Sequence, residues 1–137
     1  MQQVQQVQRV SADAGLVWDG DPDIGGVWGA GTVMRVMGLR RSELDRRRAR
    51  LHLLAVWGDW RWWYPSRQFH QVDGAGSVLE GLAPVLEMLV PVIDAAPTAR
   101  WLGSACADLG GTTPWDALSV GDDRAGVLAA AGRRAGR

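Results

Sequence analysis

The strongest chemical signal in this sequence is a cluster of arginines between positions 40 and 50. Residues 35–67 carry nine arginines against three acids, whereas residues 68–123 carry one arginine against eight acids. An arginine side chain makes planar, paired contacts to phosphate and to guanine. The chain has no lysine, which we attribute to overall composition, so only the clustering is informative. The segregation of charge indicates that the two halves meet different partners and that the basic half meets nucleic acid.

Residue types that support catalysis or metal binding are few and scattered. His52 and His70 have no nearby cysteine or orienting acid, and no serine lies in a nucleophile motif. Cys106 is the single cysteine, which excludes an internal disulfide and argues against structural zinc. Asp122 and Asp123 stand at a predicted helix start, where acids cap more often than they bind metal. We expect no enzymatic activity, no metal and no cofactor.

The arginines fall on a predicted helix-turn-helix. Apolar residues recur at helical spacing over residues 33–37, and Gly38 ends that helix. Ser42 is the expected N-cap of a second helix, SELDRRRAR, whose Leu44 should face the core. The second helix of such a motif enters the major groove of DNA. The side chains expected to contact DNA are Arg40, Arg41, Ser42, Arg46 and Arg48.

The alternative for this segment is a solvated helix with a purely structural role. Glu43 stands three and four residues before Arg46 and Arg47, a spacing that suits ion pairs on one helix face. Arg47 also occupies a position that a recognition helix commonly gives to an apolar residue.

Residues 51–69, LHLLAVWGDWRWWYPSRQF, hold four of the eight tryptophans, the only tyrosine and the only phenylalanine. Two β-prone runs flank Gly58-Asp59, which predicts a hairpin with these two residues at its tip. Beside a helix-turn-helix such a hairpin would form a wing. We expect Trp60, Trp62 and Trp63 to be packed between the two halves. The alternative is an exposed stacking platform for bases or sugars.

The 137 residues suit one domain or two small ones that share a core. We expect a mobile or loosely docked arm over residues 1–30, a winged helix-turn-helix-like unit over 31–69, and a helical unit with a basic tail over 70–137. Spacing and caps predict helices over residues 82–90, 97–107, 113–120 and 122–131. No apolar run reaches the roughly 18 residues of a membrane span, and the N-terminus lacks a signal core, so we expect no membrane contact and a cytoplasmic location.

Several short motifs of the second half occur in a recognisable order. They are Ala99-Arg-Trp-Leu102, Leu109-Gly-Gly-Thr-Thr-Pro114, Ala117-Leu118, Gly121 and a closing helix with Val127 and Leu128, preceded by Tyr64-Pro-Ser-Arg-Gln-Phe69. Over residues 30–134 the chain resembles the MbcA/ParS/Xre antitoxins. In that family a tryptophan helix, an LGG turn and two further helices form the toxin-binding domain, and a YP-x-x-QF segment joins it to a helix-turn-helix. One departure is residues 105–108, where the family often has a Pro-Asn pair.

The resemblance implies an antitoxin of a type II toxin–antitoxin system. Such a protein covers the active site of a partner toxin, commonly a RES-domain protein that degrades NAD, and represses its own operon. The implied fold is mainly α, with a helix-turn-helix, a small β-hairpin wing and a compact helical toxin-binding unit. By motif the toxin-facing residues are Trp101, Leu109, Gly111, Pro114 and Trp115, to which the charge distribution adds Arg133, Arg134 and Arg137.

A second hypothesis is a stand-alone DNA-binding transcriptional regulator whose helical half serves only to dimerise. Both hypotheses predict a homodimer, because palindromic operators match the two-fold symmetry of the protein that binds them.

Overall fold

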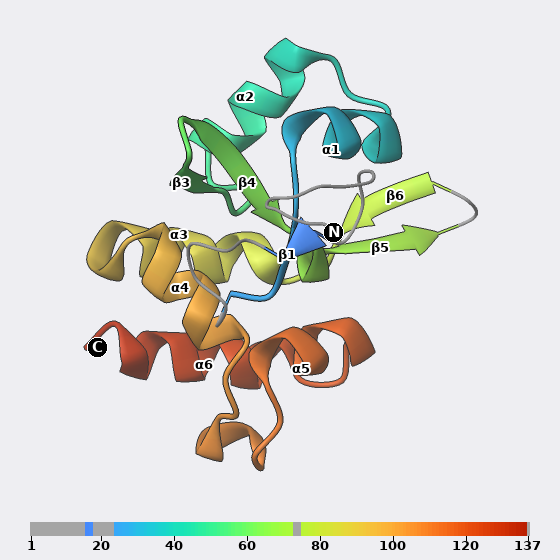
Figure 1. Ribbon diagram of the computed structural model, residues 1–137. Coiled ribbons are helices and arrows are strands. Elements are labelled where there is room, and N and C mark those ends of the chain that lie inside the picture. The colour runs from blue at the N-terminus through green and yellow to red at the C-terminus, as the bar shows by residue number, and fades with distance from the viewer. Residues whose placement is uncertain (1–15, 18–23, 73–74, 137) are drawn as a thin grey trace.

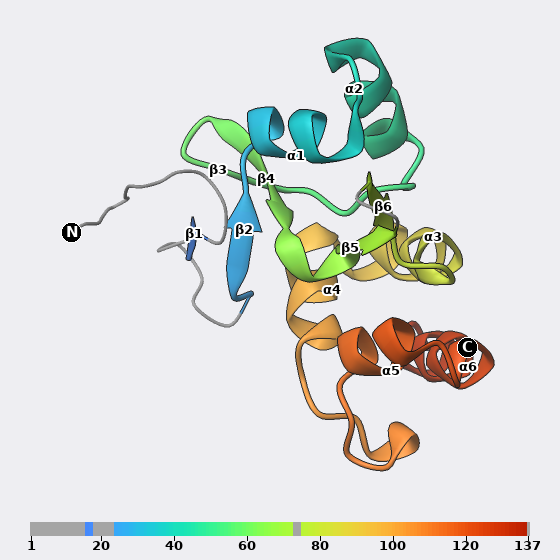
Figure 2. The same cartoon turned by 90° about the vertical axis from the view of Figure 1, so that its right-hand side faces the viewer.

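The structure is a computed structural model that describes residues 16–17, 24–72 and 75–136 (Figure 1). Within these ranges the chain is mainly helical, with a small antiparallel sheet of strands in the order β1 (Leu16–Val17), β2 (Gly26–Trp28), β4 (Arg61–Pro65) and β3 (Val56–Gly58). The helices are α1 (Ala30–Met37), α2 (Arg41–Ala49), α3 (Leu82–Ile93), α4 (Ala95–Leu102), α5 (Pro114–Val120) and α6 (Arg124–Arg134). Two views at right angles place α1 and α2 on one side of the sheet and α3 to α6 on the other (Figures 1 and 2). None of the helices in this described part has the length and apolar character to cross a membrane.

Helices α1 and α2 are joined by a tight turn. Gly38 ends α1 in a left-handed conformation with φ of 67°, which glycine adopts without a steric penalty. The backbone N–H of Leu39 donates to the carbonyl of Met34 at 3.0 Å and closes the turn. Leu44 of α2 is fully buried, as its position in the sequence predicts.

The N-cap of helix α2 lies two residues earlier than expected. Arg40 occupies the N-cap position, and the carboxylate of Glu43 accepts a hydrogen bond from the Arg40 backbone N–H at 2.8 Å. A carboxylate three residues into a helix commonly stabilises its start in this way. The prediction that Ser42 caps the helix is therefore wrong, and Ser42 lies exposed in its first turn.

Strands β3 and β4 form the predicted hairpin, but its tip is shifted by one residue. Gly58 pairs with Arg61, which leaves Asp59 and Trp60 as the two-residue loop. Trp60 is 90% exposed, so the expectation that it is packed is wrong. The cross-strand pairing, in which Trp57 lies opposite Trp62, sets this register rather than the Gly58-Asp59 dipeptide.

Strand β4 separates two hydrophobic cores. Successive side chains of a strand point to opposite faces. Trp63 packs in a core with residues of the helical half such as Leu86, whereas the adjacent Tyr64 packs with Val33 and Leu44 of the helix pair. Trp63 is 8% exposed and Tyr64 is fully buried. One strand therefore contributes to the stability of both halves.

Part of the expected N-terminal arm belongs to this sheet. Val27 pairs with Pro65 and Trp28 with Tyr64, and Val27 is fully buried. These residues are therefore not loosely docked. Their partner strand lies almost forty positions away in the sequence, so local patterns do not show the pairing. Residues 1–15 and 18–23 of the expected arm lie outside the described residues.

The YPSRQF segment is fixed by a buried amide. The side-chain carbonyl of Gln68 accepts from the backbone N–H of Leu54 at 2.8 Å, and its NH₂ group donates to the carbonyls of Leu54 and Pro65 at 2.8 and 3.0 Å. Gln68 is fully buried at the end of the 3₁₀ turn η1 (Ser66–Gln68). Phe69 stacks on Trp28 with ring centroids 5.0 Å apart. The segment thus joins the hairpin to the chain that follows.

A second hairpin leads from this joint to the helical half. It consists of β5 (Phe69–Val72) and β6 (Ala75–Val78). Gly76 of β6 lies so close to α1 that an added Cβ atom would stand 2.3 Å from a methyl group of Val36. Only glycine fits at this contact.

The helical half follows the predicted order with shifted ends. Helix α3 continues through Pro91 to Ile93, three residues beyond the predicted end at residue 90. Helix α4 spans residues 95–102 instead of the predicted 97–107, and a 3₁₀ turn, η2 (Ala107–Leu109), follows it. Helix α5 begins as predicted, where the Thr113 hydroxyl accepts from the backbone N–H of Asp116 at 3.1 Å. Helix α6 extends into the expected basic tail and ends at Arg134.

Candidate functional site

Helix α2 and its two capping positions carry five arginines at the surface, which we call the arginine face (Arg40, Arg41, Arg46, Arg47 and Arg50). Arg40, Arg41, Arg46 and Arg50 are exposed, and Arg47 is half-buried. Figures 1 and 2 both show α2 at one extreme of the molecule, beyond α1 and the sheet. The helix can lie there because Leu44 anchors it inward.

The arginine face contains a shallow cleft of about 180 Å³. Arg46, Arg47, Arg50, His52 and Glu43 line it. The expected pairing of Glu43 with Arg46 or Arg47 is not seen, since the carboxylate of Glu43 accepts from the backbone of Arg40. Within the described ranges the three arginines of the cleft form no ion pair, so their guanidinium groups remain available to an anion.

Arg48 has a different position from the other predicted DNA-binding arginines. Its guanidinium donates to the carboxylate of Asp45 at 2.8 Å and to the hydroxyl of Tyr64 at 3.1 Å, and lies 4.6 Å from the centre of the Trp62 ring. Burial opposes charge on Arg48, but these hydrogen bonds outweigh it and leave its pKa above the ordinary value. Arg48 thereby holds α2 against β4.

A groove lies between the tip of the hairpin and the start of the helix pair. Its volume is about 410 Å³, and it is lined by Ala30, Gly31, Arg41, Trp57, Trp60, Arg61 and Trp62. Sequence reasoning placed Trp60 inside and so missed this groove. The alternative of an exposed aromatic platform, left open by the sequence, agrees with the exposure of Trp57 (51%) and Trp60.

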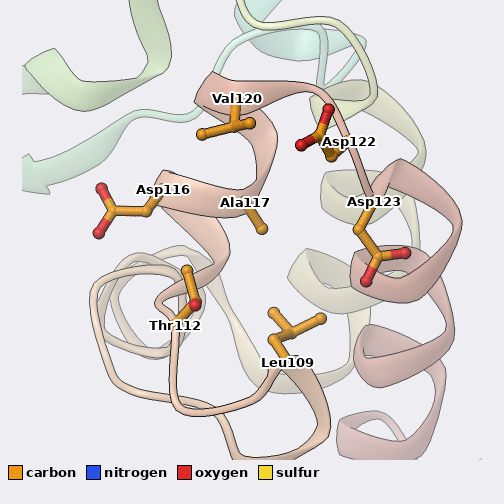
Figure 3. Close-up of a pocket in the computed structure, with 7 residues that line it drawn as sticks. All are labelled: Leu109, Thr112, Asp116, Ala117, Val120, Asp122 and Asp123. Atoms are coloured by element: carbon orange, nitrogen blue, oxygen red, sulfur yellow. The ribbon is translucent and has the colours of Figure 1, made fainter.

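A second pocket lies at the opposite end of the molecule, between η2, α5 and the start of α6 (Figure 3). We call it the acidic pocket. Its volume is about 230 Å³, and its lining is Leu109, Thr112, Asp116, Ala117, Val120, Asp122 and Asp123. Figure 3 shows Ala117 at its centre with Asp116 on one side and Asp122 and Asp123 on the other. The pocket therefore combines an apolar floor with a negatively charged rim.

The loop that carries the LGG turn forms one wall of the acidic pocket. The backbone N–H of Cys106 donates to the carbonyl of Thr112 at 3.1 Å, and that of Gly111 donates to the carbonyl of Cys106 at 2.9 Å. Gly110 and Gly111 have φ of 69° and 88°, a left-handed conformation that favours glycine. Leu109 is held by this loop at the edge of the pocket.

Of the predicted toxin-facing residues, Leu109 and the exposed Gly111 lie at this surface. Trp115 is only 2% exposed and packs in the core that also contains Trp63 and Leu86. Its ring is therefore not part of the surface. A helix of seven residues has too short a pattern to distinguish its core side from its partner side.

The remaining predicted residues are spread over the helical half. Pro114 is buried at the start of α5, and Trp101 is half-buried against the main core. Arg133 donates to the carboxylate of Asp108 at 2.8 Å, and Arg134 is exposed near the end of α6. Arg137 lies outside the described residues.

Of the seven residues that line the acidic pocket, the toxin-facing set expected from the sequence includes only Leu109. Val120 is 69% exposed at the end of α5. Asp122 makes no ion pair or hydrogen bond with the described part of the chain, whereas Asp116 pairs with Arg67. The signal available in the sequence is the order Val120-Gly121-Asp122-Asp123, an apolar residue followed by a glycine and two acids. Whether Val120 is exposed depends on how α5 and α6 pack, which the sequence does not show.

Comparisons of the chain with models of protein families, with curated proteins and with solved structures give no match. The function therefore has to be argued from the surfaces. Among the described residues, His, Cys, Asp and Glu form no group of three or more that could hold a metal ion. His70 Nε2 lies 3.0 Å from the hydroxyl of Ser77, but the two are a cross-strand pair of β5 and β6 and line none of the pockets above.

Proposed function

We propose that this chain is an antitoxin of the MbcA/ParS/Xre type, which binds operator DNA with one end and a partner toxin with the other. The observation that carries the proposal is the separation of two unlike surfaces at opposite ends of one small fold. The arginine face lies on α2, and the acidic pocket lies between α5 and α6 (Figures 1 and 3). A surface rich in unpaired guanidinium groups suits phosphate, and an apolar pocket with an acidic rim suits a basic protein segment.

At the DNA end, α1, the Gly38 turn and α2 would act as a helix-turn-helix with the hairpin as its wing. Arg46, Arg47 and Arg50 would contact phosphates, and Arg40 and Arg41 would lie at the start of the recognition helix. Each phosphate neutralised on duplex DNA adds about 0.9 to the slope of log K against log salt. Two copies of the chain on a palindromic operator would act as the autorepressor.

At the other end, the acidic pocket would receive an arginine or lysine of the partner. The aliphatic stem of such a side chain would pack on Leu109, Ala117 and Val120, while its charged head would meet Asp122 and Asp123. The partner implied by the motifs is a RES-type, NAD-degrading toxin, neutralised when the LGG loop and α5 cover its active site. No chemistry by this chain is required.

A second candidate function is a stand-alone transcriptional regulator that dimerises through its helical half. The observation that favours it is Val120, which is exposed beside an apolar floor and could pack against a second copy. In that case the acidic pocket would be lost from the surface in the dimer, and no toxin would bind there.

The proposal is tested by co-expression with the protein encoded in the adjacent reading frame. Val120→Arg places a positive charge in the acidic pocket and should abolish both neutralisation and co-purification of the toxin. Val92→Arg is the matched control, because Val92 is an exposed valine (49%) on α3, which does not line the pocket. Full neutralisation by Val120→Arg would disprove the partner site. A wild-type dimer that Val120→Arg converts to a monomer, without any toxin partner, would instead favour the regulator.

A further inference from the structure

We propose that the groove at the hairpin tip binds unpaired bases of single-stranded nucleic acid. This site differs from the arginine face, which suits the backbone of duplex DNA, and it does not depend on a toxin partner. Its elements are three tryptophans from the hairpin and two arginines, one from α2 and one from β4.

The backbone of the hairpin tip is strained. Asp59 and Trp60 both have left-handed conformations, with φ of 50° and 60°. Two-residue hairpin loops of this kind favour Asn-Gly or Asp-Gly, because glycine adopts the second position without strain. Trp60 occupies that position and is 90% exposed. The fold therefore gains no packing in return for a strained, apolar residue, and an external ligand explains its presence.

Two aromatic rings of the groove contact each other. Trp57 is half exposed and meets Trp62 edge to face, with ring centroids 5.1 Å apart and planes at 70°. The guanidinium of Arg48 also lies over the Trp62 ring, 4.6 Å from its centre. The rings are thus fixed before a ligand arrives, and fixed aromatic faces are what bases stack on in single-strand binding proteins.

The size and charge of the groove suit a base flanked by phosphates. The groove volume of about 410 Å³ falls within the range of roughly 300–1,000 Å³ that is common for small-ligand sites. Arg41 and Arg61 line it, and the guanidinium of Arg61 lies 4.9 Å from the centre of the Trp63 ring. Among the described residues, the lining contains no carboxylate and no side-chain amide. Sugar hydroxyls need such acceptors, whereas bases flanked by phosphates need aromatic faces and cations. The acid at the tip, Asp59, lies outside the lining.

The position of Arg41 connects the groove with the arginine face. Arg41 lines the groove and begins α2, whose further arginines lie along the same helix. A strand whose bases stack in the groove would have its backbone guided along α2. The proposed ligand is therefore a single strand of several nucleotides rather than a free nucleotide.

Fluorescence anisotropy of a labelled twelve-nucleotide dT strand with the full chain provides the test. The wild type should bind, and Trp60→Gly should bind about 5-fold to 100-fold more weakly, the loss expected for one stacked base. Glycine suits the tip conformation, so this variant keeps its fold. Trp57→Ala should also weaken binding, while the control Val92→Ala should bind as the wild type does. An rU strand of equal length shows which backbone is preferred, and tight binding of either supports the proposal.

Three results would overturn the inference. The first is a wild type that binds neither strand at low salt. The second is a Trp60→Gly variant that retains wild-type affinity while Arg41→Ala loses it. In that case the groove would attract the phosphates of the strand without stacking its bases. The third is binding to vesicles containing phosphatidylserine that is lost in Trp60→Gly, without any binding of oligonucleotides, which would identify the tip as a membrane contact.

Discussion

Replacement of Trp60 by glycine should stabilise the protein although it removes a large aromatic side chain. The left-handed conformation costs a residue with a Cβ atom about 1–2 kcal/mol relative to glycine, and Trp60 has φ of 60°. Little burial is lost, because the side chain is 90% exposed. Against this gain, glycine increases the freedom of the unfolded chain, which costs about 0.4–1 kcal/mol. The expected net gain is therefore roughly 0.5–1 kcal/mol, or a Tm about 2–5 °C higher.

Gly38→Ala is the matched control for this prediction. Gly38 has φ of 67°, and no atom lies within 4 Å of an added Cβ, so the backbone conformation is the main term that changes. In Gly38→Ala the left-handed conformation becomes unfavourable, whereas the reduced freedom of the unfolded chain recovers part of the loss. The free energy of unfolding should therefore fall by roughly 0.5–1 kcal/mol. Urea unfolding of both variants gives the two differences directly. A loss of stability in Trp60→Gly would refute the reasoning, because it would mean that the ring contributes packing to the fold in solution.

Three further outcomes are expected. Gln68→Met should cost about 2–4 kcal/mol in urea unfolding, because it leaves polar atoms of Leu54 and Pro65 buried without partners; a cost below about 1 kcal/mol would show that water replaces the amide. Burial raises the pKa of the Tyr64 hydroxyl above 10.0, against the smaller opposing effect of Arg48. The raised pKa favours the folded state at all pH values below 10.0, and this contribution is lost as the pH rises through the folded pKa. The unfolding free energy of the wild type should therefore fall more steeply at alkaline pH than that of Tyr64→Phe. Because Tyr64 is the only tyrosine, its titration can be followed by tyrosinate absorbance, and a midpoint at or below the ordinary value would contradict the buried environment. Arg46→Ala with Arg50→Ala should reduce the salt slope of duplex DNA binding by about 2, whereas Arg124→Ala, on the distant α6, should leave it unchanged.

The elements that sequence reasoning located best are those fixed by neighbouring residues. Thr113 and Pro114 define the start of α5 through a cap and a preset φ, both of which act within one turn. Gly38 and Leu44 define the end of α1 and the inward face of α2 in the same local way. These signals do not depend on the rest of the fold, so the sequence was sufficient.

The misplaced features depend on contacts between distant residues. Strand β2 exists because Val27 and Trp28 pair with β4, and nothing near them in the sequence indicates this partner. The tip of the first hairpin was shifted because cross-strand pairing outweighed a turn-prone dipeptide. Trp115 was assigned to the toxin-facing surface through its family motif, yet its ring enters the core. A short sequence motif does not show which of its side chains face outward.

The position of β4 between two cores determines how the proposed functions can be separated. Trp63 belongs to the core that α3 to α6 complete, so removal of those helices would expose it together with Val27, Val56 and Leu54 of the first half. Tyr64, on the other face, belongs to the core beneath α2, and Arg48 ties that helix to the same strand. A truncated chain that fails to bind DNA or toxin would therefore report unfolding rather than the loss of a surface. Single substitutions of exposed side chains, such as those at Arg46, Trp60 and Val120, leave both cores intact, and only variants of this kind can assign a binding activity to one end of the molecule.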